Sequence, residues 1–151
     1  MNVRFVSKFL YICNLKSLFM KLNSLKIWTV LKIVIALFMI YAGIQHFVKP
    51  FIFIPFVPEF LPLKLSIVYA SGVVEILVGF LLLIKKYAKI GVVGILILLV
   101  LFLPIHIWDV FSESPAIGSK QAAFIRLPIQ FVLIFIVWKI KNSISQNKQI
   151  S

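Results

Sequence analysis

Six polar side chains have the types and the spacing to form one ligand-binding site. Each lies in, or at the end of, a long apolar run, and the six are His46, Ser71, Glu75, His106, Arg126 and Gln130. Residues four apart share one face of a helix, as Ser71 and Glu75 do, and the same spacing joins Arg126 to Gln130. Carboxylate, guanidinium, imidazole, hydroxyl and amide groups can together hold the polar head of a ligand. The set predicts a polar pocket, provided that the fold brings these residues to one level.

Glu75 and Arg126 are the two members of the set that are charged in water at neutral pH. An ionisable side chain near the centre of a membrane helix costs about 2.5 to 3.5 kcal/mol on insertion scales, so Glu75 needs a partner or a proton. Arg126 has a long side chain and a permanent charge, which makes it the expected partner. The same pair also fits a purely structural role, in which it fixes the register of two helices.

The two histidines allow other kinds of site. His46 and His106 at similar depth could ligate a haem, although both lie at the rim of the apolar runs and a haem sits deeper. A metal site of His46, His106 and Asp109 has no diagnostic spacing. Both histidines also fit as plain interfacial residues. The sequence contains no HExxH, GxSxG or CxxC motif and no glycine-rich phosphate loop, and its one cysteine, Cys13, has no partner for an internal disulfide. We therefore expect no catalytic activity of the chain's own.

Four apolar runs must position these residues. Of the 151 residues, 62% are hydrophobic and 13% are charged, which is far from the composition of a soluble domain. The runs cover about 27–47, 65–84, 88–108 and 122–140, and each approaches the ~20 residues that cross a hydrocarbon core of ~30 Å. Lipid leaves backbone polar groups without partners, so such spans must be helices. The predicted fold is all-α, a polytopic membrane protein with a bundle of four transmembrane helices.

The positions of the basic residues predict the orientation. Sixteen Lys and Arg against four Asp and Glu give a formal net charge of +12, but the basic residues flank the apolar runs. This distribution sets membrane topology and does not indicate a nucleic-acid partner. Basic residues crowd the N-terminal segment, the turn at 85–89 and the C-terminal end, so both termini and this turn should be cytoplasmic. All six site residues then fall in the outward half of the bundle.

The four-helix domain is expected over residues 27–141. The basic, amphipathic segment 1–26 suits the surface of an anionic leaflet, and if translation starts at Met20 the first 19 residues are a non-structural extension. Residues 142–151 form a cytoplasmic tail. The connection 48–64 holds four prolines and four phenylalanines, so it should lie in the membrane interface, either as a cap over the outer mouth of the bundle or as a plain connector.

Five segments of the chain, taken in order, resemble a known family. They are AGIQHFVKP, VPEFLP, YASGVVEILVGFLLL, FLPIHIWD and IRLPIQ, within about residues 30–140. This series is similar to the DoxX-like family of small four-helix membrane proteins, and its motifs fall on His46, Ser71, Glu75, Arg126, Pro128 and Gln130. Many members carry a Pro-Ala-Asn-like turn late in the third span, where this chain has Pro104, Ile105 and His106. No role of that asparagine carries over.

The resemblance implies a multi-pass protein of the bacterial inner membrane. The family name derives from a subunit linked to thiosulfate oxidation with quinone reduction, and related members are associated with membrane redox complexes. Similar four-helix proteins elsewhere look like assembly factors or receptor chaperones. The resemblance gives weight to the motif residues without assigning them roles.

Three functions follow as hypotheses. In the first, the outward pocket holds the head of an amphipathic ligand such as a quinone, and the chain is an accessory to a membrane oxidoreductase in the lipid bilayer. In the second, the chain is an assembly factor, chaperone or scaffold, and Glu75 with Arg126 only locks the bundle. In the third, Glu75 carries protons in a coupled transporter, which the apolar inward half disfavours.

Overall fold

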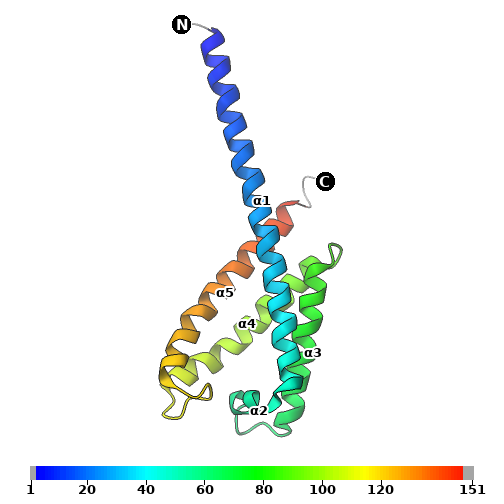
Figure 1. Cartoon of the computed structure of the whole chain (residues 1–151), viewed down its shortest axis with the longest axis vertical. Helices are drawn as coiled ribbons and strands as arrows, with labels where there is room; N and C mark the ends of the chain where they lie inside the picture. Colours follow the sequence, from blue (N-terminus) through cyan, green and yellow to red (C-terminus); the bar gives the residue numbers. More distant parts are fainter. Residues whose placement is uncertain (1–2, 148–151) are drawn as a thin grey trace.

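The computed structural model describes residues 3–147, and the side chains of residues 26–145. Throughout this range the chain forms helices, turns and loops, and no strand. The helices are α1 (Val3–Val48), α2 (Pro50–Phe53), the 3-10 helix η1 (Ile54–Phe56), α3 (Lys64–Leu83), α4 (Ala88–Phe111) and α5 (Lys120–Asn147). The all-α prediction is confirmed (Figure 1).

Four of the described helices are long and apolar enough to cross a membrane. These segments are Lys26–Val48, Lys64–Leu83, Ala88–Phe111 and Lys120–Ser145, so the predicted four apolar helices of spanning length are confirmed. Both ends of the first and second segments agree with the prediction within one residue. The third and fourth helices run further than predicted. The fourth starts early because the Ser119 hydroxyl accepts a hydrogen bond from the backbone N–H of Ala122, which caps the first turn.

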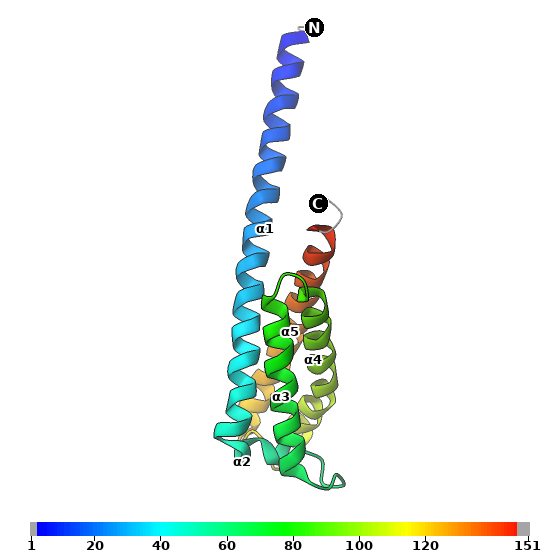
Figure 2. The same ribbon diagram turned by 90° about the vertical axis from the view of Figure 1, so that its right-hand side faces the viewer.

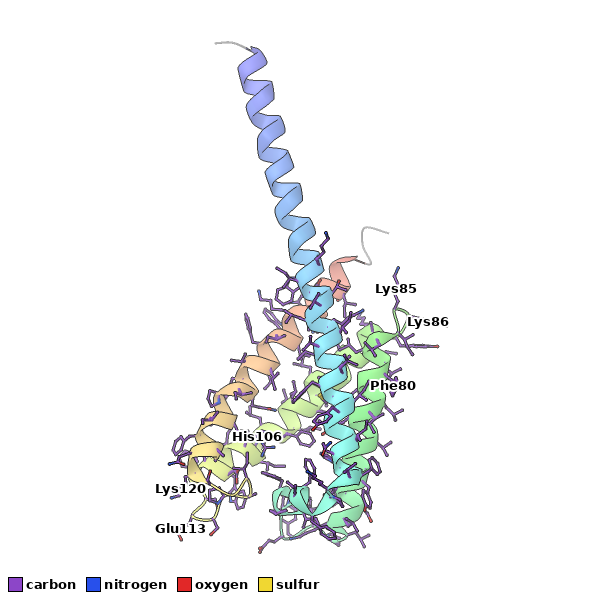
Figure 3. The ribbon with its side chains drawn as sticks, in the orientation of Figure 1. Phe80, Lys85, Lys86, His106, Glu113 and Lys120 are labelled. Atoms are coloured by element: carbon purple, nitrogen blue, oxygen red, sulfur yellow. The ribbon has the colours of Figure 1, made fainter. Side chains whose placement is uncertain are left out.

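The long helices form a bundle in which neighbours along the chain are neighbours in space. α1 packs along α3, α3 along α4, and α4 along α5, whereas α1 and α5 touch much less. The bundle has two ends, which we name the α2 end, after the short helix there, and the terminal end, where α1 leaves the bundle and α5 finishes (Figures 1 and 2). Lys85 and Lys86 lie at the terminal end, and Glu113 and Lys120 at the α2 end (Figure 3).

The segment before the first span continues α1. From residue 3 the helix runs without a break into the span, and it projects beyond the other helices (Figure 2). Residues 1–42 contain neither proline nor glycine, so nothing in the sequence interrupts the helix there. The predicted C-terminal tail, 142–151, is helical as far as Asn147, and residues 148–151 lie outside the described range.

The apolar core occupies the terminal end. Its buried members come from all four long helices and are Ile35, Ala36, Met39, Val78, Leu82, Ala88, Val92, Ile95, Leu99, Val137 and Ile140. The buried polar side chains are His46, Glu75, His106, Asp109 and Gln130. Buried polar groups thus gather toward one end of the bundle, and the other end is packed with aliphatic side chains.

Two glycines set how closely α1 and α3 approach beside the buried polar groups. A Cβ atom on Gly43 would lie 2.6 Å from the Gly72 carbonyl oxygen, and one on Gly72 would lie 2.7 Å from the His46 Cβ atom. No larger residue fits at either position without moving a helix. This contact brings His46 of α1 against the face of α3.

Candidate functional site

A cavity of about 370 Å³ lies between the helices toward the α2 end. All six residues predicted to form a pocket line it, and they come from α1, α3, α4 and α5 (His106 is labelled in Figure 3). The rest of the lining is almost entirely apolar and aromatic. The fold therefore brings the whole predicted set to one place.

His46 is held in one orientation by α3. Its Nδ1 atom lies 2.9 Å from the Val68 carbonyl oxygen, which can only accept, so Nδ1 carries a proton and donates it. The Ser71 hydroxyl donates to the same carbonyl oxygen at 2.9 Å, and its oxygen lies 2.8 Å from Nδ1 as a second acceptor. With Nδ1 committed in this way, the Nε2 atom is the group left for other chemistry.

Glu75 lies next to that free nitrogen. His46 Nε2 and Glu75 Oε1 are 3.7 Å apart, and both side chains are buried. A net charge is costly in such a place, so we infer that the two groups hold one exchangeable proton between them and stay neutral as a pair. The second carboxyl oxygen, Oε2, has no hydrogen-bond partner. This side of the cavity can therefore accept or give a proton.

The expected ion pair between Glu75 and Arg126 is not formed. Among the described side chains, His46 is the basic group within ion-pair distance of Glu75. The reason is packing: α1 and α3 meet closely beside His46, whereas α3 and α5 have hardly any direct contact. Glu75 and Arg126 line the same cavity without pairing.

Arg126 lies instead over an aromatic ring of the first connection. Its guanidinium carbon is 4.4 Å from the centroid of the Phe56 ring, a cation–π contact, and its Nη1 atom has no hydrogen-bond partner.

Asp109, considered above only as a metal ligand, lies just past residue 108, the predicted end of the third span, and does not line the cavity. α4 continues through it to Phe111, and only 1% of Asp109 is exposed. Its Oδ1 atom accepts a hydrogen bond from the backbone N–H of Ala116, and its Oδ2 atom has no partner. The spacing of three residues from His106 was the available signal, because it places both on one helix face.

Gln130 fixes α5 to α4. Its Nε2 atom donates to the Leu99 carbonyl oxygen at 2.7 Å, and Gln130 is buried. Gln130 therefore contributes a structural link as well as a wall of the cavity.

The first connection closes the cavity toward the α2 end. Phe53, Phe56, Val57, Pro58 and Leu61 all line the cavity, and the Phe53 and His46 rings lie with their centroids 3.9 Å apart. Pro50 starts α2 and Pro55 lies in η1, so prolines define the short turns that carry these side chains. The connection therefore covers the cavity at the α2 end, and the outward orientation of this end stays a prediction.

Four buried polar atoms among the described side chains have no hydrogen-bond partner. They are Glu75 Oε2, His106 Nδ1, Asp109 Oδ2 and Arg126 Nη1. Leaving such an atom unpaired costs about 1 to 3 kcal/mol. Three of the four residues line the cavity, so a bound molecule could pair with them.

The metal and haem hypotheses gain no support from the geometry. The described residues contain no group of three or more His, Cys, Asp and Glu placed to hold a metal ion. Both ring nitrogens of His46 already face Val68, Ser71 or Glu75, so neither is directed at an axial position of a haem.

Residues 35–141 match the model of a protein family described as Domain of unknown function (DUF8561). The chain belongs to this family. The DUF8561 match contains all six site residues and Asp109, whereas α1 up to residue 34 lies before it. Comparison with curated proteins and with solved structures gave no match.

Proposed function

We propose that the protein binds the ring head of a neutral amphipathic lipid, of the quinone class, in this cavity. The observation that carries the proposal is the pair of unpaired polar atoms, Glu75 Oε2 and Arg126 Nη1, on helices that do not pack together, within a cavity otherwise lined by apolar and aromatic groups. A ring with oxygens at opposite ends could contact Glu75 with one oxygen and Arg126 with the other. Arg126 would donate a hydrogen bond to one ring oxygen. The Glu75 carboxyl group would donate a hydrogen bond to the other oxygen of a quinone, or as a carboxylate would accept one from the hydroxyl of a quinol.

The charges around the cavity favour a neutral head. His46 and Glu75 form a neutral pair if the two share one proton. The proposal takes Asp109, on the adjoining helix α4, to balance the charge of Arg126, so that the sum is zero before anything binds. A phosphate head would add an uncompensated charge at membrane depth, which is costly.

Size and lining support the same class of ligand. A cavity of about 370 Å³ lies within the usual range of small-molecule sites, about 300 to 1,000 Å³. Phe53 and Phe56 offer aromatic faces beside His46 and Arg126, against which a flat ring can pack.

The cellular role follows from the resemblance to the DoxX-like family. In this proposal the protein lies in a bacterial inner membrane with both termini in the cytoplasm, and the α2 end faces outward. It delivers or holds quinone for a membrane oxidoreductase and has no catalysis of its own. The apolar core at the terminal end, where Leu82, Val92 and Ile95 have no exposed surface, gives no support to the proton-transporter alternative.

The test is direct binding of a radiolabelled benzoquinone with a decyl tail to the protein in detergent. Arg126→Ala should weaken binding by about 1.5 to 3 kcal/mol, which is about tenfold or more in Kd, because it removes a charged donor. Glu75→Gln should weaken it less, because the amide keeps the shape and one acceptor. Matched controls are Lys120→Ala at the exposed start of α5 and Glu59→Gln in the exposed part of the connection. Absence of binding to the wild type, or equal affinity in all variants, would refute the proposal.

A further inference from the structure

We infer that the ligand enters and leaves the cavity sideways, from the hydrocarbon layer, through an opening between α1 and α5. This deepens the proposed function and rests on it, because it takes the occupant to be a lipid whose tail stays in the bilayer. The opening is named here the α1–α5 portal, with Phe38 and Ile129 as its two edges.

The exposure of the lining residues locates the portal. Of the described residues that line the cavity, only Phe38 and Ile129 are exposed, at 49% and 50%. The others are buried or half-buried. Phe38 belongs to α1 and Ile129 to α5, so the cavity reaches the molecular surface between these two helices.

The packing of the bundle explains why the opening lies at this seam. The glycine contact joins α1 to α3, and the Gln130 hydrogen bond joins α5 to α4. Between α1 and α5 the shared apolar cluster lies at the terminal end, where Trp28 of α1 belongs to the same core as Ile140 of α5. Toward the α2 end the two helices diverge (Figure 1).

The depth of the portal decides what can pass it. Phe38 lies ten residues before Val48, and Ile129 lies nine residues after Lys120, the ends of their spans at the α2 end. At 1.5 Å per residue both lie about 14 to 15 Å from that end, close to the middle of a core of about 30 Å. The portal therefore faces acyl chains.

The first connection covers the cavity on the side of the α2 end, which is the side nearer to the aqueous phase. Phe53, Phe56 and Val57 line it from that side, and none of them is exposed. A lipid can thus place its polar head near Glu75 and Arg126 and leave its tail between Phe38 and Ile129.

Photolabelling from within the bilayer tests the portal. The full chain is placed in phosphatidylcholine vesicles that contain a neutral long-chain alcohol with a diazirine in the middle of the chain. After illumination, labelled residues are identified by mass spectrometry. The buried residue Leu99, which lines the cavity, should be labelled, and the buried residue Leu82, which does not line it, should not.

Variants at the portal edges separate lateral access from other routes. Ile129→Trp should abolish labelling of Leu99, whereas Val132→Trp should not, because Val132 is also exposed on α5 but does not line the cavity. Phe38→Ala should increase the labelling, and Leu37→Ala is its control on the same helix. If Leu99 stays unlabelled in the wild type, or its labelling is the same in Ile129→Trp and in Phe38→Ala as in the wild type, the portal is wrong.

A competition arm distinguishes this failure from failure of the proposed function. If the alcohol labels Leu99 through the portal and the decyl benzoquinone does not reduce that labelling, the portal is correct and quinone binding is wrong. If the benzoquinone binds in detergent but neither portal variant changes the labelling of Leu99, quinone binding is correct and the portal is wrong.

Discussion

The terminal end and the α2 end of the bundle are built from the same four helices. They differ in whether their buried side chains find partners. At the terminal end, Leu82, Val92, Ile95 and Val137 have no exposed surface, and they pack against one another. Toward the α2 end the helices surround a cavity, and buried polar atoms lack partners. Close packing at the terminal end stabilises the fold, whereas the unpaired polar groups toward the α2 end destabilise it.

This difference separates stability from binding along one molecule. Substitutions at the terminal end should lower the free energy of unfolding without a direct effect on a ligand. Substitutions at the cavity should change binding and should cost little stability, because they remove groups that are poorly satisfied. The predictions below test that separation, from the largest expected effect to the smallest.

Leu82→Ala should have the largest effect on stability. Leu82 is fully buried, so the variant leaves a void that the neighbouring helices cannot fill, and such voids cost about 2 to 5 kcal/mol. Unfolding by sodium dodecyl sulfate in mixed micelles, followed by circular dichroism, measures the change. Leu77→Ala is the control, since Leu77 lies on the same helix and is exposed. Equal losses in both variants would contradict the view that the terminal end carries the stability.

Gly72→Ala should lower stability and binding together. The added Cβ atom would lie 2.7 Å from the His46 Cβ atom and 2.9 Å from the Gly43 carbonyl oxygen, so α1 must move away from α3. Overpacking of this kind costs about 1 to 3 kcal/mol, and the shift also separates His46 from Glu75.

Gly94→Ala is the control for Gly72→Ala. There the added Cβ atom meets the Val78 side chain and no backbone atom, so a rotation of Val78 can relieve the contact. A stability loss in Gly72→Ala no greater than in Gly94→Ala would show that the α1–α3 contact is less rigid than the distances indicate.

The spans and the set of site residues could be predicted from the sequence because both depend on position along one helix. Hydropathy gives the number of spans, and 1.5 Å per residue gives each polar residue a depth. Residues on different helices but at similar depth, such as Ser71 and Arg126, then meet wherever the helices enclose a common space. The orientation of the bundle in the membrane is still a prediction from the basic residues.

The pairing within the site could not be predicted because it depends on which helices touch. Glu75 lies beside His46 because glycines bring α1 against α3, and a pattern along one helix contains no information about its neighbour. The third span was predicted to end at about residue 108, before Asp109, because hydropathy falls there, although the helix continues to Phe111. The α1–α5 portal depends on a contact that is mostly missing, which no single segment reveals.

Glu75→Leu should weaken binding more than Glu75→Gln and leave the free energy of unfolding equal or higher. The carboxyl group is buried and its Oε2 atom has no partner, and its neighbour His46 is neutral without the shared proton, so the variant leaves no unpaired charge behind. The same detergent unfolding and benzoquinone binding assays measure both quantities. This variant discriminates most sharply between the ligand site and the scaffold hypothesis, because a structural lock should lose stability when its carboxylate is removed. A clear loss of stability in Glu75→Leu would favour the scaffold.

Ser71→Ala should have the smallest effect. The Ser71 hydroxyl shares the Val68 carbonyl oxygen with His46 Nδ1, and Nδ1 keeps that acceptor at 2.9 Å when the hydroxyl is lost. We therefore expect His46 to keep its orientation, stability to fall by no more than about 1 kcal/mol, and the Kd for benzoquinone to change by less than about threefold. Ser66→Ala, at an exposed position one turn earlier on α3, is the control. A loss of binding as large as in Arg126→Ala would mean that Ser71 contacts the ligand itself, and that the polar wall of the cavity extends further along α3 than Glu75.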